Sequence, residues 1–540
     1  MARQIIWMLS AILISGMALT SCSDKDEPAT SPDDPIAENL ADVTIIYYGC
    51  GGGNLDGMNV GNMRELYKAK TESYKNVKVV MLYKFSKTKE FDPEAKELFR
   101  KDLEEKGEAY MDSTARNSTY LKWIGPKANA TFRYVLDPEQ TLQRQVSTSY
   151  LPETNIDFTH PDTLASYIRW AAEQCPAKRY MLLLTDHGRG FLPYQEVGDG
   201  SFVNYYDTDP RVQTRALLDD TGLSKSLTVF ELAQAIKSSG VKISTVYFDC
   251  CLMNSLEYLF ELKDLCDYVV ASSYSLQGGG YYNALLDCFA QYPQDIQQGL
   301  TEYTRMLMKK WDVDLWDGSS PLYQDVTITR TDCLNHLGEM MGDFVERLCN
   351  TYQNDTDEQR QRIDQVTAKA VRVSDKFDRF DAAKYMEKIL LALPEVYGDQ
   401  FNKDMEKAFN DCILAQVYSQ YLSIHAYMVD YTVLLATNGN TFRTIWNKNY
   451  LDRATLYKAD GSIVEYTGVK GYYKNEDDFD YALEQIGEGN WGGTLDGTFG
   501  QLAFDKITGW SRWLYMNQQQ TPLWSKSGFN EEVYPDDDDD

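Results

Sequence analysis

Hydrophobic and polar positions follow two different periods along the first part of the chain. Apolar runs of strand length occupy residues 43–48, 77–83, 131–136, 180–185, 243–248 and 268–272. Segments with apolar side chains at helical spacing lie between them, at residues 63–70, 161–174, 230–237 and 255–262. Short buried runs that alternate with amphipathic helices predict a parallel sheet covered by helices on both faces.

The pattern changes beyond residue 320. Amphipathic helices are expected at residues 333–348, 355–371, 380–391 and 401–417, strands at 424–428, 431–436 and 502–504, and a glycine-rich loop at 491–500. No repeat of solenoid length stands out. We therefore expect an α/β fold with its main domain at residues 43–320, a C-terminal α+β portion at 321–530 and an acidic tail at 531–540.

The first 21 residues have the pattern of a secretory signal peptide. Arg3 provides the positive charge, and residues 5–19 form an apolar stretch too short to span a bilayer. The ending LTSC at residues 19–22 resembles a bacterial lipobox, which implies cleavage before Cys22 and acylation of its sulfur. A plain signal peptide with an incidental cysteine is the alternative.

Residues 22–42 are rich in Pro, Asp, Glu and Ala without apolar periodicity, and we expect a disordered tether. Within it, Lys25 is followed by two acidic residues. Such a run is similar to a surface-export signal of some Gram-negative lipoproteins, and a short charged tether is the other interpretation. The expected location is the bacterial cell envelope, with a lipid anchor in the outer membrane and exposure either to the periplasm or at the cell surface.

Composition argues against several classes of partner and of site. The net charge is −28 and no basic stripe is present, which argues against nucleic acid as a partner. Besides Cys22 there are nine cysteines, an odd number without a C-x-x-C pair. Neither a zinc knuckle nor a dense disulfide framework is indicated. The sequence predicts no metal and no cofactor, and leaves a calcium requirement open.

Two of the apolar runs end in reactive side chains. His187 follows the run at 180–185, and Cys251 follows the run at 243–248. Open α/β sheets carry their chemistry just beyond the carboxyl ends of such strands, where an imidazole can take the proton of a thiol. The backbone N–H groups of Gly188 and Cys251 would then form an oxyanion hole, as in acyl transfer through a thioester. Taken singly, each residue is more typical of a structural role.

The motifs around these two residues resemble a known family. Asp186-His187-Gly188 after one strand, and Asp-x-Cys-Leu-Met-x-Ser-x-Glu at residues 249–257 after another, are similar to the clostripain family of cysteine peptidases. The resemblance extends over residues 43–515. It implies a caspase-hemoglobinase-like fold, a parallel-rich sheet flanked by helices.

The resemblance also implies roles for individual residues. His187 would be the general base and Cys251 the nucleophile, with Cys250 a neighbour rather than the attacking thiol. Gly188 and Cys251 would provide the oxyanion donors. Asp249 either shapes the site or caps the following turn, and no third catalytic residue is assigned.

The substrate is expected to be a peptide or protein. Family members that cut after Arg or Lys need a carboxylate in the first specificity pocket, and residues 271–280 contain none. Preference for Arg or Lys therefore stays open. Some members mature by internal cleavage between the two motifs, and the loop at 200–216 offers Arg211 and Arg215 for self-cleavage.

The main alternative is a surface lipoprotein that binds glycans or peptides without catalysis. The 38 Tyr and 10 Trp residues could stack on sugar rings. A helical-repeat glycan binder should lack the two strand-end motifs, whereas a degenerate peptidase that only binds would keep them. The interpretation that agrees with most of the sequence is a lipoprotein cysteine endopeptidase.

Overall fold

The computed structural model describes most of the chain between residues 40 and 517. The described residues are 40–51, 55–85, 129–153, 155–188, 194–196, 202–204, 217–220, 223, 225–273, 276, 280–311, 324–354, 356–368, 372–374, 379–418, 443–445, 456–457, 463–464 and 502–517. Cys22, Arg211 and Arg215 lie outside them. So do the expected strands at 424–428 and 431–436, and these predictions, like the domain boundaries, stay predictions.

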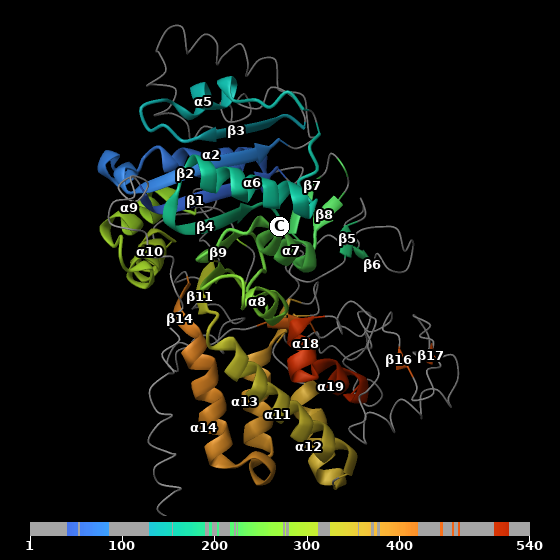
Figure 1. Cartoon of the computed structure of the whole chain (residues 1–540). Helices are drawn as coiled ribbons and strands as arrows, with labels where there is room; N and C mark the ends of the chain where they lie inside the picture. Colours follow the sequence, from blue (N-terminus) through green and yellow to red (C-terminus); the bar gives the residue numbers. More distant parts are fainter. Residues whose placement is uncertain are drawn as a thin grey trace, which may run out of the picture. The chain divides into compact units, whose positions relative to one another are not determined.

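The centre of the fold is an eight-stranded, mostly parallel sheet (Figure 1). Its order is β14-β11-β10-β9-β4-β1-β2-β3, where the strands are β1 (Ala41–Cys50), β2 (Val77–Lys84), β3 (Thr131–Val135), β4 (Ala177–Thr185), β9 (Thr245–Asp249), β10 (Tyr268–Ala271), β11 (Asp325–Arg330) and β14 (Ile413–Tyr418). The five strands from β2 to β10 run parallel. Strands β3, β11 and β14 are antiparallel to their neighbours. The six strands expected in the first part of the chain are confirmed.

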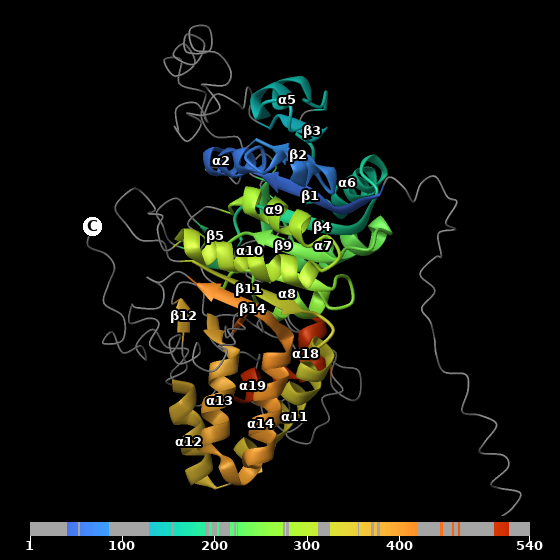
Figure 2. The same ribbon diagram turned by 90° about the vertical axis from the view of Figure 1, so that its left-hand side faces the viewer.

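Helices cover both faces of this sheet (Figure 2). One face packs on α6 (Pro161–Gln174), α7 (Val229–Ser239) and α8 (Leu256–Leu262), and the other on α2 (Asp56–Leu66), α9 (Tyr282–Gln291) and α10 (Ile296–Trp311). Neighbouring positions on β4 enter opposite cores, Leu182 the first and Leu183 the second. Both faces are buried, so each central strand is a nearly continuous apolar run. The expected α/β class with a parallel-rich sheet is confirmed.

Two helices that lead into the central strands have strong local signals. Helix α6 starts at Pro161 as expected, because the side chain of His160 accepts a hydrogen bond from the N–H of Asp162 and Pro fits the first helical turn. Helix α7 begins with a capping box, in which Thr228 and Glu231 satisfy each other's backbone N–H groups. It ends at Gly240, which adopts a left-handed conformation. Caps of this kind make these helices predictable from sequence.

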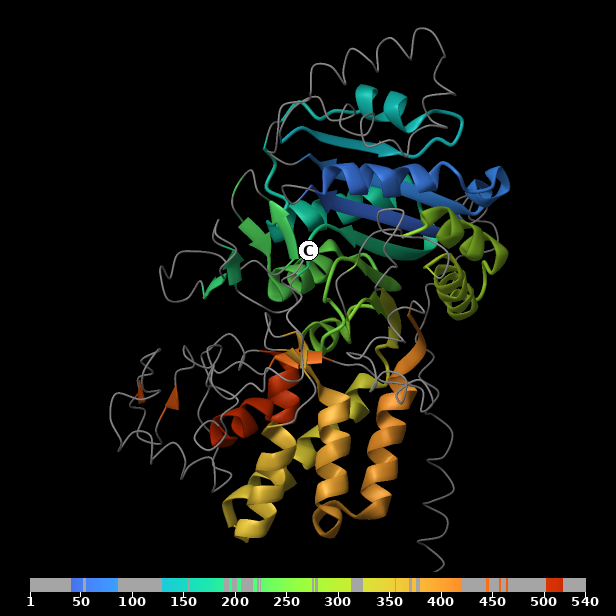
Figure 3. The ribbon, with the colours of Figure 1, turned by 180° about the vertical axis from the view of Figure 1, so that it is seen from behind.

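The later helices of the chain are α11 (Leu334–Asn354), α12 (Asp357–Ala368), α13 (Ala382–Ala392), α14 (Pro394–Cys412), α18 (Ala503–Thr508) and α19 (Trp510–Asn517) (Figure 3). Helix α18 packs on α8, since the rings of Phe260 and Phe504 lie 5.4 Å apart and the N–H of Ala503 donates to Glu261 at 2.5 Å. The C-terminal part of the chain therefore supports the helix that follows the cysteine strand.

Two expectations for this part were wrong. Residues 413–417, expected to extend the last helix, form β14, because Ile413 adopts extended backbone and pairs with Thr329 on the open edge of β11. Residues 502–504, expected as a strand, begin α18. Leu502 is the extended N-cap of that helix, and the buried Phe504 and Thr508 lie one helical turn apart on one face.

Smaller elements complete the described chain. They are η2 (Thr71–Lys75), α5 (Leu142–Thr148), β5 (Tyr194–Glu196), β6 (Phe202–Asn204), β7 (Leu217–Asp220), β8 (Lys225–Leu227), β12 (Arg372–Ser374), β13 (Arg379–Asp381), β15 (Arg443–Ile445), β16 (Leu456–Tyr457) and β17 (Ile463–Val464). Strands β7 and β8 form a small antiparallel pair beside the main sheet. This pair lies next to the candidate site.

Candidate active site

The carboxyl ends of β4 and β9 bring the two sequence motifs together. The strands are parallel neighbours with Thr185 opposite Asp249, so His187 and Cys251 each lie two residues beyond a paired position. The backbone of Gly188 lies directly against that of Cys251. A Cβ atom placed on Gly188 would lie 2.3 Å from the carbonyl oxygen of Cys251 and 2.8 Å from Cβ of Cys250. Only glycine fits at this contact.

Cys251 sits in a sharp turn and is partly exposed. The next residue, Leu252, is held in the left-handed region with φ of 63°, a conformation that costs a non-glycine residue roughly 1–2 kcal/mol. The Sγ atom of Cys251 accepts a hydrogen bond from the N–H of Leu276 at 3.2 Å. A donor aimed at the sulfur favours the thiolate over the thiol.

Helix α8 does not begin directly after Cys251. It begins at Leu256, one residue later than the pattern indicated, and residues 252–255 separate it from Cys251. The favourable field of a helix N-terminus falls off within about one turn. The N–H of Leu276 is the described donor to this sulfur, and the carbonyl oxygen of the same residue lies farther from it, at 3.8 Å.

Cys250 differs from its neighbour. Its side chain is 1% exposed, and its Sγ lies 3.4 Å from the carbonyl oxygen of Leu184. Burial, together with the negative charge of Asp186, raises the pKa of this thiol well above its ordinary value. Cys250 is thus a buried thiol whose raised pKa favours the protonated form.

Sequence reasoning missed a contact behind the histidine. The backbone N–H of His187 donates to Oδ1 of Asp186 at 2.6 Å, and the thiol of Cys50 donates to Oδ2 of the same carboxylate at 2.7 Å. Asp186 therefore holds the backbone of His187, which is partly exposed, to the end of β1. The only signal for this contact was a cysteine, Cys50, at the end of an apolar strand. Nothing in the sequence indicated which strand would lie next to it.

Asp249, at the end of β9, contacts two helices. Its carboxylate accepts hydrogen bonds from the hydroxyl of Tyr282 on α9 and, at 3.3 Å, from Nδ2 of Asn62 on α2. Burial raises the pKa of Asp249 above its ordinary value, and the hydrogen bonds from Tyr282 and Asn62 offset only part of this rise. Its partners are side chains of two helices, so Asp249 ties those helices to the end of the cysteine strand.

A second acid, which is fully buried, lies at the same edge of the sheet. Residues 271–280 contain no acid, but Asp325 on β11 reaches them from elsewhere in the chain. It accepts hydrogen bonds from the hydroxyl of Ser272 at 2.6 Å and from the N–H of Ser273 at 3.0 and 3.1 Å. This contact was not predictable from a local pattern, because Asp325 lies 53 residues after Ser272 and meets it only through the antiparallel pairing of β10 with β11.

The rest of the described chain adds little further chemistry. None of the nine cysteines there forms a disulfide. No group of three or more His, Cys, Asp or Glu side chains within it is arranged to hold a metal ion. Among the same residues, no helix combines the length and the apolar character needed to cross a bilayer.

A mostly parallel sheet whose central strands end in a histidine and a cysteine at one edge defines a caspase-like α/β fold. The model of the clostripain family matches residues 50–450. The chain therefore belongs to the clostripain family of cysteine peptidases, as its motifs indicated. A comparison with curated protein sequences found no match.

Several solved structures are similar to the chain. One is a secreted C11 cysteine protease from Bacteroides thetaiotaomicron, iotapain, with 15% identity and a TM-score of 0.46, over 71% of this chain and 89% of the other. Another is an inactive zymogen C11 protease from Parabacteroides distasonis, with 14% identity and a TM-score of 0.45, over 87% of this chain and 98% of the other.

Proposed function

We propose that this protein is an endopeptidase that hydrolyses peptide bonds with Cys251 as nucleophile and His187 as general base. The main support is the contact of Gly188 with Cys251, which brings the residues after the two strands to one edge of the sheet. Cys251 is partly exposed and Cys250 is buried, which supports the choice between the two thiols.

The reaction would proceed in two acyl transfers. His187 takes the proton of the Cys251 thiol, and the sulfur attacks the scissile carbonyl carbon. The oxygen of the tetrahedral intermediate, now negative, is stabilised by the N–H groups of Gly188 and Cys251. The C–N bond breaks, the leaving amine receives the proton from His187, and a thioester remains. Water, deprotonated by His187, then cleaves the thioester and restores the thiol.

Preference for Arg or Lys before the scissile bond is part of the proposal. Its support is the net charge of −28 and the two carboxylates at the site's edge, Asp249 and Asp325. A negative field at a cleft raises the local concentration of cationic substrate. Both carboxylates are hydrogen-bonded to the protein. They would therefore attract the substrate through this field, or contact its cationic side chain after these hydrogen bonds are exchanged.

The proposed location is the bacterial cell envelope, through a lipid on Cys22. The support is the sequence of residues 1–22 alone. Metabolic labelling with a fatty-acid analogue tests it: label on the wild-type protein and none on a Cys22→Ala variant is expected. Label on neither protein would contradict the anchor.

The catalytic proposal is tested with peptidyl thiol-reactive probes that carry Arg, Lys or Ala at the position before the reactive group. Label is expected on Cys251 at neutral pH, strongest with Arg or Lys, and lost in Cys251→Ala but kept in the matched control Cys250→Ala. No label on folded wild type would favour the alternative, a degenerate peptidase that only binds. Equal labelling by all three probes would remove the basic preference.

Self-cleavage at Arg211 or Arg215 is proposed with the same preference. The intact mass of recombinant wild type is compared with that of Cys251→Ala and of Arg211→Ala/Arg215→Ala. Two fragments from the wild type and one intact chain from each variant are expected. Identical intact masses for all three would contradict self-cleavage.

A further inference from the structure

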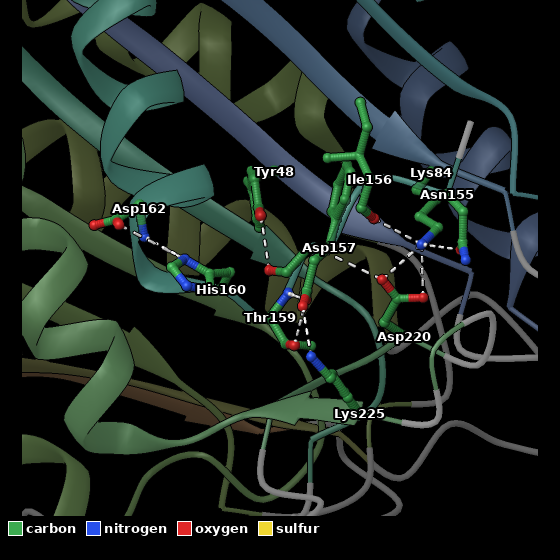
Figure 4. A network of polar contacts seen from close by, with 11 residues as sticks. Tyr48, Lys84, Asn155, Ile156, Asp157, Thr159, His160, Asp162, Asp220 and Lys225 are labelled. Atoms are coloured by element: carbon green, nitrogen blue, oxygen red, sulfur yellow. Dashed lines mark hydrogen bonds and ion pairs between the residues drawn. The ribbon is translucent and has the colours of Figure 1, made fainter. Parts of the chain in front are cut away.

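A buried ion pair lies between the end of β2 and the β7–β8 pair (Figure 4). The Nζ atom of Lys84 contacts both carboxylate oxygens of Asp220, at 2.7 and 2.6 Å. The two side chains are 2% and 1% exposed. A buried ion pair is weak evidence for a role in stability, since apolar side chains of similar volume often replace it without loss. Its presence therefore calls for a reason other than stability.

The pair is completed by one loop, the segment before α6. Lys84 also donates to Oδ1 of Asn155 at 3.0 Å and to the carbonyl oxygen of Ile156 at 2.7 Å. Asp220 in turn accepts from the N–H of Phe158 at 3.2 Å. These directional bonds fix Asp220 relative to β2 and to the loop (Figure 4). Apolar side chains could fill the same space but could not define that position as closely.

Asp220 is the last residue of β7, and the strand it ends is strained. Leu218 is fully buried and has φ of 58°, in the left-handed region. The pairing of β7 with β8 is irregular between Leu217 and Asp220. A non-glycine residue keeps such a conformation only when its surroundings hold it there. The ion pair is a fully buried polar contact at the end of this strand.

The other end of β7 touches the candidate active site. Leu217 forms an antiparallel bridge with Gly188, the residue that follows His187 and packs on Cys251. The loop proposed for self-cleavage ends just before Leu217. A cut there would turn β7 into a chain end, held only by its own contacts.

We propose that Lys84 and Asp220 are positioning residues, which keep β7 docked on Gly188 after the loop is cut and so hold the oxyanion donor in place. This inference rests on the proposed function. A chain end beside the site would otherwise fray, because the left-handed Leu218 favours release. The fixed ion pair at the other end of the four-residue strand prevents this.

The main test uses Asp220→Asn, which keeps the shape and the acceptor for Phe158 but removes the charge. The matched control is Lys225→Met. Lys225 also joins the β7–β8 pair to the same loop, through Asp157 at 2.8 Å, but its side chain is 39% exposed (Figure 4). We expect kcat of Asp220→Asn on a fluorogenic peptide to fall roughly 10- to 100-fold with KM within about threefold, and kcat of Lys225→Met to stay unchanged.

Hydrogen exchange provides the second measurement. In Cys251→Ala protein whose loop has been cut by limited trypsin treatment, amides 217–220 should stay protected. Adding Asp220→Asn should remove this protection only in the cut protein. Wild-type kcat in Asp220→Asn, or protected amides in its cut form, would overturn the proposal. If wild type shows no peptidase activity, the proposed function fails. The exchange measurement then still decides whether the ion pair holds β7 in place.

A double variant, Lys84→Met/Asp220→Leu, covers the case in which Asp220→Asn does not fold. It leaves no orphan charge and should fold. The N–H of Phe158 and the carbonyl of Ile156 lose their partners, so its stability should fall by about 1–3 kcal/mol for each. A positioning role predicts that the folded double variant loses kcat and the protection of cut β7. Full kcat and full protection in the double variant would show that the pair is merely structural and would refute the inference.

Discussion

Replacing Gly188 by alanine should damage the active site far more than the fold. The added Cβ would lie 2.3 Å from the carbonyl oxygen of Cys251, whereas ordinary contact begins at 3.4 Å. Both clashing groups belong to the ends of central strands, so the backbone at Gly188 or Cys251 must move by about 1 Å. A misplacement of about 1 Å at reacting groups can reduce the rate roughly 100-fold.

The measurement is kcat and KM on a fluorogenic peptide, together with the midpoint of urea unfolding. We expect Gly188→Ala to lose about 100-fold in kcat. Gly61→Ala is the matched control, since the same methyl group meets nothing within 4 Å on helix α2. That control should keep full activity and gain up to about 1 kcal/mol in stability, because alanine favours a helix over glycine.

One result would refute this reasoning. If folded Gly188→Ala had kcat within about threefold of wild type, the contact of Gly188 with Cys251 would not define a catalytic geometry. The proposal that the N–H of Gly188 stabilises an oxyanion would then lose its main support.

Further predictions concern the surroundings of the site. Burial raises the pKa of Asp505 from 3.8 to about 6, so the native state holds this proton more tightly than the unfolded chain. The free energy of unfolding should therefore fall by up to about 3 kcal/mol as pH rises from 4 to 6, and Asp505→Asn should remove this loss in urea titrations across that range. An unchanged slope would contradict the pKa. Thr228→Ala breaks the capping box of α7 and should lower stability by about 1 kcal/mol in the same assay; an unchanged midpoint would argue against the cap. Cys50→Ala removes one donor from the buried Asp186. It should lower the free energy of unfolding by about 1–3 kcal/mol and also lower kcat, whereas Cys50→Ser should keep most of both. Equal kinetics of the two variants would show that the donor has no role.

The parallel core and its strand-end residues were predictable because their signals are local. A buried central strand is a continuous apolar run, and the reactive residue follows it at once, as in Thr185 before His187. Helix α6 has its proline and its cap within three residues. The family motifs then linked the two strand ends across 64 residues of sequence.

The remaining features depend on contacts that have no local signal. Residues 413–417 continue a helical pattern, and only the open edge of β11 makes them a strand. Asp325 reaches Ser272 from a strand that pairs through that edge. Cys50 and Asp186 meet because β1 and β4 are neighbours, which the order of strands in the chain does not reveal.

The two antiparallel strands at the far edge of the sheet determine how this protein can be shortened. Strands β11 and β14 come from the later half of the chain, yet they shield β10. A polypeptide that stops near residue 320 would expose the backbone donors and acceptors of β10. Such an unpaired edge forms hydrogen bonds with the strands of other chains. Attempts to produce the peptidase half alone should therefore yield insoluble aggregates, even with every residue of the strand-end motifs retained.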